Sequence, residues 1–333
     1  MATQIVSSVS QTHSTVSVTL PRKVADKEVL SIAVEEIPQH YDLNGDRFEV
    51  PTFTMKQVYD AIPSHCFQPV NVRSMGYVLR DLALSAILIY SATYIHLIPS
   101  PALRGLAWTA YTVAQGMVWT GIWILGHECG HGALFTHRWL NRLVGLILHS
   151  FLLMPFHSWR ISHSKHHKAT GHMDRDMVFI PETKDQYLTR KFGQDFDLDS
   201  TLDDAHAHAG HMHLLEDTPL YSLYKLLEHQ LVGMPGYLLL SLSAPYKRDR
   251  WWTLSHFYFG NGSPIFNPQD ARDVIISDLG IVAILAAIYT SVQLLGAWNT
   301  FIGYIVPYLM VNHWIGRSLQ PLRSRLLSFG EMA

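Results

Sequence analysis

The sequence predicts an all-α integral membrane protein with about four transmembrane helices in two hairpins and a cytosolic helical cap. Hydrophobic residues make up 48% of its 333 residues and charged residues only 16%, against roughly 25% charged in soluble domains. Several uncharged runs approach the length of about 20 residues that a helix needs to cross a bilayer. Two histidine clusters between these runs predict that the cap carries a His-rich metal site.

Four apolar runs define the predicted crossings. They are Tyr77–Ile98, Gly105–Leu125, Leu279–Trp298 and Thr300–Ile315. Pro99-Ser-Pro101 forms a turn between the first two runs. Only Asn299 separates the last two runs, so each pair predicts a hairpin that crosses the membrane and returns.

Two hairpins would leave both ends of the chain and the long Gly126–Asp278 segment on one side of the membrane. That segment contains many basic residues, among them Lys165, Lys168, Arg175, Arg190, Lys191, Lys247, Arg248 and Arg250. Basic residues near the ends of spans favour the cytosolic side, which predicts that both histidine clusters face the cytosol.

Two shorter apolar runs, Leu143–Phe156 and Leu231–Ala244, are too short to span comfortably. We interpret them as interfacial or re-entrant helices, although buried core helices fit their length equally well. We expect residues 1–54 to form a polar, disordered N-terminal segment, residues 55–315 to form the membrane domain, and residues 316–333 to form a divergent tail. The Ala205–His213 tract is expected to lie in a loop.

Charge and cysteine content exclude several classes of function. The net charge of −2, without a basic stripe interleaved with aromatic residues, predicts no nucleic-acid partner. The two cysteines, Cys66 and Cys129, predict neither a disulfide framework nor a cysteine-based zinc site.

Metal binding is predicted by the spacing of five histidines in two boxes. The boxes read His127-Glu-Cys-Gly-His131 and His163-Ser-Lys-His166-His167, and these five histidines are the candidate metal ligands. Spacings of three and four residues place each set on one face of a helix. Neutral imidazole suits iron, copper, nickel and zinc. The first box follows directly after the second apolar run, and we predict no catalytic residue beyond the ligands.

Three kinds of metal site are compatible with the first box. His-Glu-x-x-His is the zinc-protease signature, with Glu128 as the general base, but that site does not need the second box. Glu128-x-x-His131 fits half of a ferritin-like carboxylate site, yet the sequence contains no second Glu-x-x-His. The remaining hypothesis is an all-histidine di-iron centre that activates dioxygen to remove hydrogen from an unactivated methylene.

Acidic residues beside the boxes are candidates to hold the other ring nitrogens of the ligands. Glu128, Asp174 and Asp176 are the nearest in sequence. A solvated face, or salt bridges to Arg160, Lys165 or Arg175, would explain each acid equally well.

The two boxes and their surroundings resemble membrane fatty-acyl desaturases of the microsomal oleate type, especially the fungal Δ12 and ω3 enzymes. The matching segments are His127-Glu-Cys-Gly-His131, Trp159-Arg-Ile-Ser-His163-Ser-Lys-His166-His167, Arg175-Asp-Met-Val-Phe, Glu216-Asp-Thr-Pro-Leu-Tyr221 and Pro307-Tyr-Leu-Met-Val-Asn-His-Trp314. The resemblance covers roughly residues 50–315.

The resemblance implies insertion of a double bond into a phospholipid acyl chain, most simply oleoyl to linoleoyl. It also implies iron, dioxygen and electrons from cytochrome b5 and its reductase, at the endoplasmic reticulum membrane. Association with itself or with other desaturases is a further implication. An ω3 desaturase, an acetylenase or a conjugase would use the same metal set.

One departure from the family pattern concerns the end of the sequence. The family carries a third box, His-x-x-His-His, downstream of its Asn-His-Trp segment, whereas residues 316–333 contain no histidine. We therefore expect a truncated chain with an incomplete di-iron site, which inserts into the membrane without making double bonds. The alternative hypothesis from another functional class is a non-catalytic membrane protein.

Overall fold

The computed structural model describes residues 52–172, 175, 176, 178, 180, 183, 218–241 and 251–315, apart from the Trp251 side chain. The predictions for most of residues 1–54, for Asp174, for the Ala205–His213 tract and for the tail 316–333 lie outside these residues. Two units are distinguished, residues 1–62 and 63–333. In the first, Thr54 and Gln57 form a reciprocal capping box that begins helix α1 (Met55–Ala61).

The described part of the second unit is helical and contains no strand, as predicted. In chain order its elements are η1 (Ser64–Phe67), α2 (Asn71–Ala92), η2 (Ile95–Leu97), α3 (Pro101–His131), α4 (Arg138–Phe151), α5 (Phe156–Ala169), α8 (Pro219–Leu240), η4 (Trp251–Leu254), η5 (Pro268–Asp270), α9 (Ala271–Leu295), α10 (Ala297–Thr300) and the π-helix η6 (Phe301–Ile305), followed by α-helix over 306–315.

Among the described residues, two helical segments are long and apolar enough to cross a membrane, Asn71–Leu97 and Pro268–Leu295, and α4 with α5 would be a third if this bent pair formed one span. In α2 the buried side chains include Asp81 and Ser85, whereas Leu79 and Ile87 are exposed. This pattern is the reverse of a soluble helix, which buries its apolar face. Polar side chains that face the helix bundle and apolar ones that face outward are typical of helices in lipid.

The structure corrects several predicted boundaries. The second hairpin turns at Gly296, which has a φ of 86°, and not at Asn299. The run Leu143–Phe156 is not one helix, because α4 ends at Phe151 and α5 begins at Phe156, with a bend of 106° between them. The chain reverses through Leu153, which has a φ of 54°, and Pro155 then precedes α5.

The predicted helix Leu231–Ala244 begins much earlier than expected. Helix α8 starts at Pro219 and continues through Pro235 to Leu240. Thr218 caps it, because its hydroxyl accepts a hydrogen bond from the Tyr221 backbone N–H at 3.2 Å. The sequence-based boundary was placed late because polar residues such as Lys225 interrupt the apolar run within the helix.

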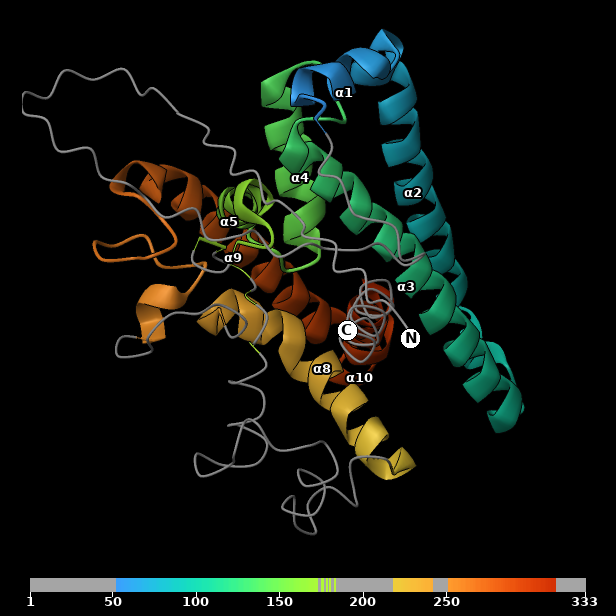
Figure 1. Cartoon of the computed structure of the whole chain (residues 1–333). Coiled ribbons are helices and arrows are strands. Elements are labelled where there is room, and N and C mark those ends of the chain that lie inside the picture. The colour runs from blue at the N-terminus through green and yellow to red at the C-terminus, as the bar shows by residue number, and fades with distance from the viewer. Residues whose placement is uncertain are drawn as a thin grey trace, which may run out of the picture. The chain divides into compact units, whose positions relative to one another are not determined.

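Helices α2 and α3 lie side by side as a hairpin (Figure 1). Pro101 occupies the first turn of α3 and Ser100 caps it, which fixes the turn that the Pro-Ser-Pro sequence predicts. Within the hairpin the Ser85 hydroxyl accepts hydrogen bonds from Gln115 Nε2 at 2.6 Å and from Trp119 Nε1 at 2.8 Å. These bonds fix the register of α3, whose far end carries the first histidine box.

Small residues let α3 approach α4 and α5 closely. A Cβ on Gly126 would lie 2.1 Å from the His149 ring, and one on Gly130 would lie 2.7 Å from Trp159. In α4, a Cβ on Gly145 would lie 2.2 Å from the fully buried Phe156. The contacts between α3, α4 and α5 therefore depend on glycine at these positions.

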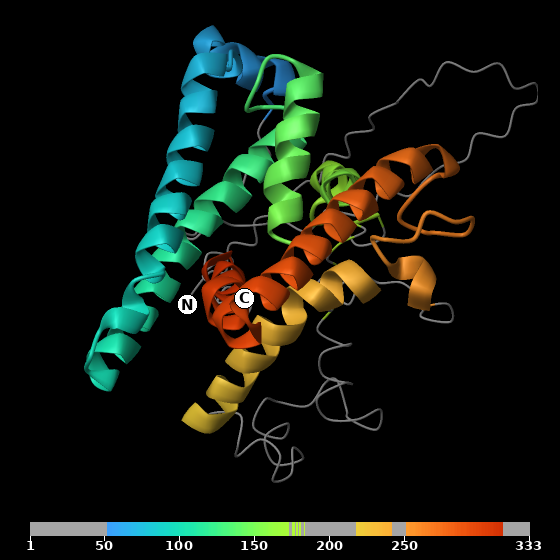
Figure 2. The ribbon, with the colours of Figure 1, turned by 180° about the vertical axis from the view of Figure 1, so that it is seen from behind.

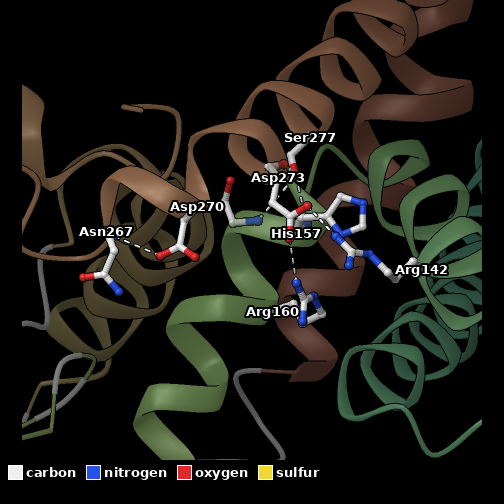
Figure 3. Close-up of polar contacts among 8 residues, drawn as sticks. Arg142, His157, Arg160, Asn267, Asp270, Asp273 and Ser277 are labelled. Atoms are coloured by element: carbon white, nitrogen blue, oxygen red, sulfur yellow. Dashed lines mark hydrogen bonds and ion pairs between the residues drawn. The ribbon is translucent and has the colours of Figure 1, made fainter. Parts of the chain in front are cut away.

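Helix α9 packs against α4 and α5 (Figure 2) and is joined to both by polar contacts (Figure 3). Asp273 pairs with Arg142 of α4 and, at 2.9 Å, with Arg160 of α5. The Ser277 hydroxyl accepts the His157 backbone N–H at 2.9 Å, which satisfies a donor in the first turn of α5. The start of α9 thereby fixes the start of α5.

We predict that Gly145→Ala destabilises the protein by about 1–3 kcal/mol, because the added methyl overpacks a closed core around Phe156. The matched control is Gly76→Ala in α2, where no atom lies within 4 Å of the new Cβ. There the better helix propensity of alanine should stabilise the protein by up to about 1 kcal/mol. Denaturant titration in detergent micelles measures both; equal effects of the two substitutions would contradict the packing described.

Candidate metal centre

The two histidine boxes lie on two helices that contact each other. His127 and His131 occupy the last turn of α3, and Gly132 ends that helix in the left-handed conformation with a φ of 70°. His163 and His167 occupy the second half of α5. Both boxes are therefore on rigid helices, as the spacing of the histidines predicted.

Four of the five predicted ligands converge. The ligand atoms of His127, His131, His163 and His167 all lie within 4.8 Å of one another. His163 Nε2 is central, at 2.9 Å from His127 Nε2, 3.3 Å from His131 Nε2 and 3.0 Å from His167 Nε2. A fourth contact, of 3.2 Å, joins the Nε2 atoms of His127 and His131.

These separations fit a single first-row transition metal. Ligand nitrogens at roughly 2.1 Å from an ion lie about 3.0 Å apart at right angles and about 3.4 Å apart in a tetrahedron. The observed nearest separations, 2.9–3.3 Å, fall within this range. The donor set contains only imidazole nitrogen, which suits iron, copper, nickel or zinc and not a hard ion such as calcium.

His166, the fifth predicted ligand, does not join this cluster. Its Nδ1 lies 2.7 Å from Oδ1 of Asp176, a carboxylate that is 2% exposed. The Asp176 carboxylate also accepts the Val178 backbone N–H at 3.0 Å. Asp176 was one of the acids expected to hold a ring nitrogen, and the structure brings it to His166.

Glu128 contacts His127 in the same way that Asp176 contacts His166, through the Nδ1 atom of the ring. Its Oε1 lies 3.0 Å from His127 Nδ1. A carboxylate at Nδ1 holds the proton there, which leaves a lone pair on Nε2, the atom that faces the other histidines. The alternative salt bridges are not found for Arg160 and Lys165, since Arg160 pairs with Asp273 and Lys165 donates to the Ile265 carbonyl.

The surroundings of the cluster favour uncharged imidazole. Burial, followed by repulsion from the neighbouring histidines, lowers the pKa of His163 to about 3. Burial also lowers the pKa of His131 and of His167, and in both cases nearby histidines add to the effect. Neutral rings offer lone pairs at physiological pH, which is the form that binds a metal.

Two tryptophans cover the rings of the first histidine of each box. Trp159 stacks on His163 with ring centroids 4.3 Å apart, and Trp123 stacks on His127 at 5.5 Å. Sequence analysis missed both, although each tryptophan precedes its histidine by four residues and so shares its helix face. The repeated Trp-x-x-x-His spacing was the available signal.

Three further histidines among the described residues lie outside the four-histidine cluster. His149 is buried, with Nε2 3.0 Å from the Trp123 carbonyl oxygen. His157 is buried beside Asp273 and Arg142 (Figure 3). His313 makes an edge contact with the Trp314 ring, with centroids 5.6 Å apart.

Outward-facing apolar helices and a four-histidine cluster that could hold a metal indicate a membrane protein with a candidate metal site. A family model described as fatty acid desaturase matches residues 106–321, a stretch that contains both boxes. The chain belongs to the fatty acid desaturase family.

The chain is also similar to curated relatives. It is 44% identical over 270 residues to a Delta(12) fatty acid desaturase of Mortierella isabellina and to another of Mortierella alpina, covering 80% of this chain and 64% of each relative. It is 37% identical over 288 residues to an oleate hydroxylase of Claviceps purpurea, covering 82% of this chain and 58% of the relative. The chain thus spans less than two thirds of the length of these relatives.

Family membership and geometry together disfavour the zinc-protease hypothesis. A protease would use Glu128 as a base beside an open metal position. Here the Glu128 carboxylate holds the far nitrogen of His127. Four imidazoles converge here, whereas a catalytic zinc site has three protein ligands and one position open to water.

We predict that His163→Ala raises the dissociation constant for Co²⁺ at least about 100-fold in the purified 333-residue chain. Loss of an outer partner alone costs about 10- to 100-fold, and His163 supplies the central nitrogen. His166→Ala should have a far smaller effect, and the exposed His137→Ala should have none. Visible absorption of bound Co²⁺ measures all three; equal losses in His163→Ala and His137→Ala would contradict the assigned site.

Proposed function

We propose that this protein takes part in desaturation of membrane acyl lipids, introducing a double bond at the Δ12 position of an oleoyl chain. The observation that carries the proposal is the convergence of four imidazole nitrogens in a member of the fatty acid desaturase family. The names of the two Mortierella relatives support the Δ12 position.

Iron is the metal that fits this proposal, held by His127, His131, His163 and His167. When bound, iron supplies with dioxygen the oxidising power to remove hydrogen from an unactivated methylene. Four nitrogens fill most of the coordination sphere of one ion, so a di-iron centre needs further donors. His166, whose ring centroid lies 6.3 Å from that of His163, is a further imidazole donor among the described residues. The resemblance to the family implies more histidines, in a third box.

The residues around the proposed iron would hold protons and restrict access of water. Glu128 would keep the proton of His127 on Nδ1, and Asp176 would do the same for His166. Trp123 and Trp159 would cover one face of His127 and His163. Indole rings on this side of the site would disfavour water there, whereas His131 and His167 are exposed.

The membrane arrangement that we propose has four crossings, formed by α2, α3, α9 and the helical stretch 301–315. Helices α2 and α9 belong to the two apolar candidate segments, and α3 is 31 residues long, enough to cross and to extend the first box beyond the bilayer. We place the boxes on the cytosolic face of the endoplasmic reticulum. There cytochrome b5 and its reductase would supply electrons, and other desaturases, or further copies, could associate.

The product test uses a yeast host that lacks polyunsaturated lipids. We express the 333-residue chain and a chimera joined after Ile315 to the C-terminal segment of a Mortierella relative. We expect diunsaturated C18 chains from the chimera and none from its His163→Ala variant, because His163 supplies the central nitrogen of the cluster. Gas chromatography of methyl esters identifies the products.

Other products would favour other reactions known in this family. Hydroxylated chains would favour the activity named for the Claviceps relative, and triunsaturated, acetylenic or conjugated chains would favour the corresponding reactions. An unaltered lipid profile from well-expressed, iron-loaded chimera would contradict the proposed function.

The topology test places reporter tags at residue 5, near residue 200 and at residue 333. Four crossings return the chain to the same side each time, so all three tags should be accessible in the cytosol. Protease protection in sealed microsomes measures this. Glycosylation of an acceptor site inserted near residue 200 would place that region in the lumen and overturn the two-hairpin arrangement.

A further inference from the structure

A buried polar network lies beside the histidine cluster, on the side of α5 that faces α8. It consists of Ser162 on α5, Tyr237 on α8 and His256, which follows η4. Ser162 is 2% exposed and His256 only 1%. Neither residue belongs to the four-histidine cluster, and the proposed function assigns the network no role.

The hydroxyl of Ser162 is fully used. It donates to the Trp159 carbonyl at 3.0 Å, and it lies 3.0 Å from His256 Nε2 and 3.2 Å from the Tyr237 hydroxyl. A hydroxyl has one proton and two lone pairs, so it can take part in all three contacts. Burial lowers the pKa of His256 to about 4, so its ring is neutral and has one N–H.

His256 also contacts the end of α8 directly. Its Nδ1 lies 3.3 Å from the Leu238 carbonyl oxygen, which accepts the His256 backbone N–H at 2.8 Å. The backbone bond also joins the segment after η4 directly to the end of α8.

The network and the metal centre share the same stretch of α5. Ser162 immediately precedes His163, the central nitrogen donor. Trp159, whose carbonyl accepts from Ser162, stacks on the His163 ring. Trp159 also packs against Leu238 and Phe257, the neighbours of the other two network residues. Polar and apolar contacts therefore hold this turn of α5 from the same side.

Other anchors hold α5 at other points along the helix. Asp273 and Ser277 of α9 hold its first turns, and Lys165 donates to the Ile265 carbonyl at 2.6 Å. None of these contacts, among the described residues, joins α5 to α8. Among the described residues, α8 contacts α5 through a hydrogen bond at the turn from Trp159 to Ser162. A shift of that turn would displace the His163 ring.

We propose that His256 and Tyr237 are positioning residues, which act through Ser162 and Trp159 to fix the His163 ring in the geometry that a metal requires. This inference rests on the proposed metal-binding role of His163. Partners that orient a metal ligand typically affect metal affinity about 10- to 100-fold when they are lost.

The experiment titrates Co²⁺ into the purified 333-residue chain in lipid nanodiscs and records the visible bands of the bound ion. We expect His256→Ala and Tyr237→Phe to raise the dissociation constant about tenfold and to change the band pattern. His256→Gln, which can place an N–H near the position of Nε2, should restore much of the affinity. Tyr237→Phe keeps the ring and removes only the hydroxyl, so it tests the network even if His256→Ala does not fold.

The matched control is Tyr111→Phe, which removes a hydroxyl that donates to the Gly303 carbonyl at 2.8 Å, more than four helical turns from His131. It should lower stability without changing Co²⁺ affinity or spectrum. If His256→Ala and Tyr237→Phe lower only the melting temperature and leave both readouts as in the parent, the inference is wrong. Metal binding with the expected losses but no new lipid product would instead overturn the proposed function alone.

Discussion

The contact between the end of α3 and the second half of α5 is the constraint on which the rest of the structure depends. It brings four Nε2 atoms to separations of 2.9–3.3 Å for neighbouring pairs. Without a metal charge between them, four clustered imidazoles gain little from such proximity. The approach is possible because glycine at positions 126 and 130 leaves room for the rings of His149 and Trp159. Gly126, just before the first box, and Gly130 within it therefore permit this approach.

The other helices can be understood as supports for that contact. Helix α2 fixes the register of α3 through the Ser85 hydroxyl, and α9 fixes the start of α5 through Asp273 and Ser277. Buried polar bonds are strong restraints where the surroundings are apolar, because a broken bond leaves a costly unsatisfied group. In membrane helices with outward apolar faces, inward polar contacts of this kind determine which helices pack together and in which register.

Much of this arrangement could be predicted from the sequence, but not its long-range contacts. Histidine spacing predicted both helical boxes, and Pro99-Ser-Pro101 predicted the first turn. The break before Pro155 was missed because the apolar run continues across it. Asp176 was among the acids expected to hold a ring nitrogen, but helical spacing gives a shared face and not the direction of each ring, so its pairing with His166 could not be predicted. Asp273 and His256 are distant in sequence from the residues that they hold.

The central claim is that imidazoles of α3 and α5 bind one metal together. X-ray absorption spectroscopy of the purified, iron-loaded 333-residue chain tests it most directly, because it reports which atoms are bound to the iron. The account predicts nitrogen neighbours at roughly 2.1 Å, with the multiple-scattering pattern of about four imidazole rings. Sulfur from a cysteine, or a set dominated by carboxylate oxygen with one or two imidazoles, would contradict it.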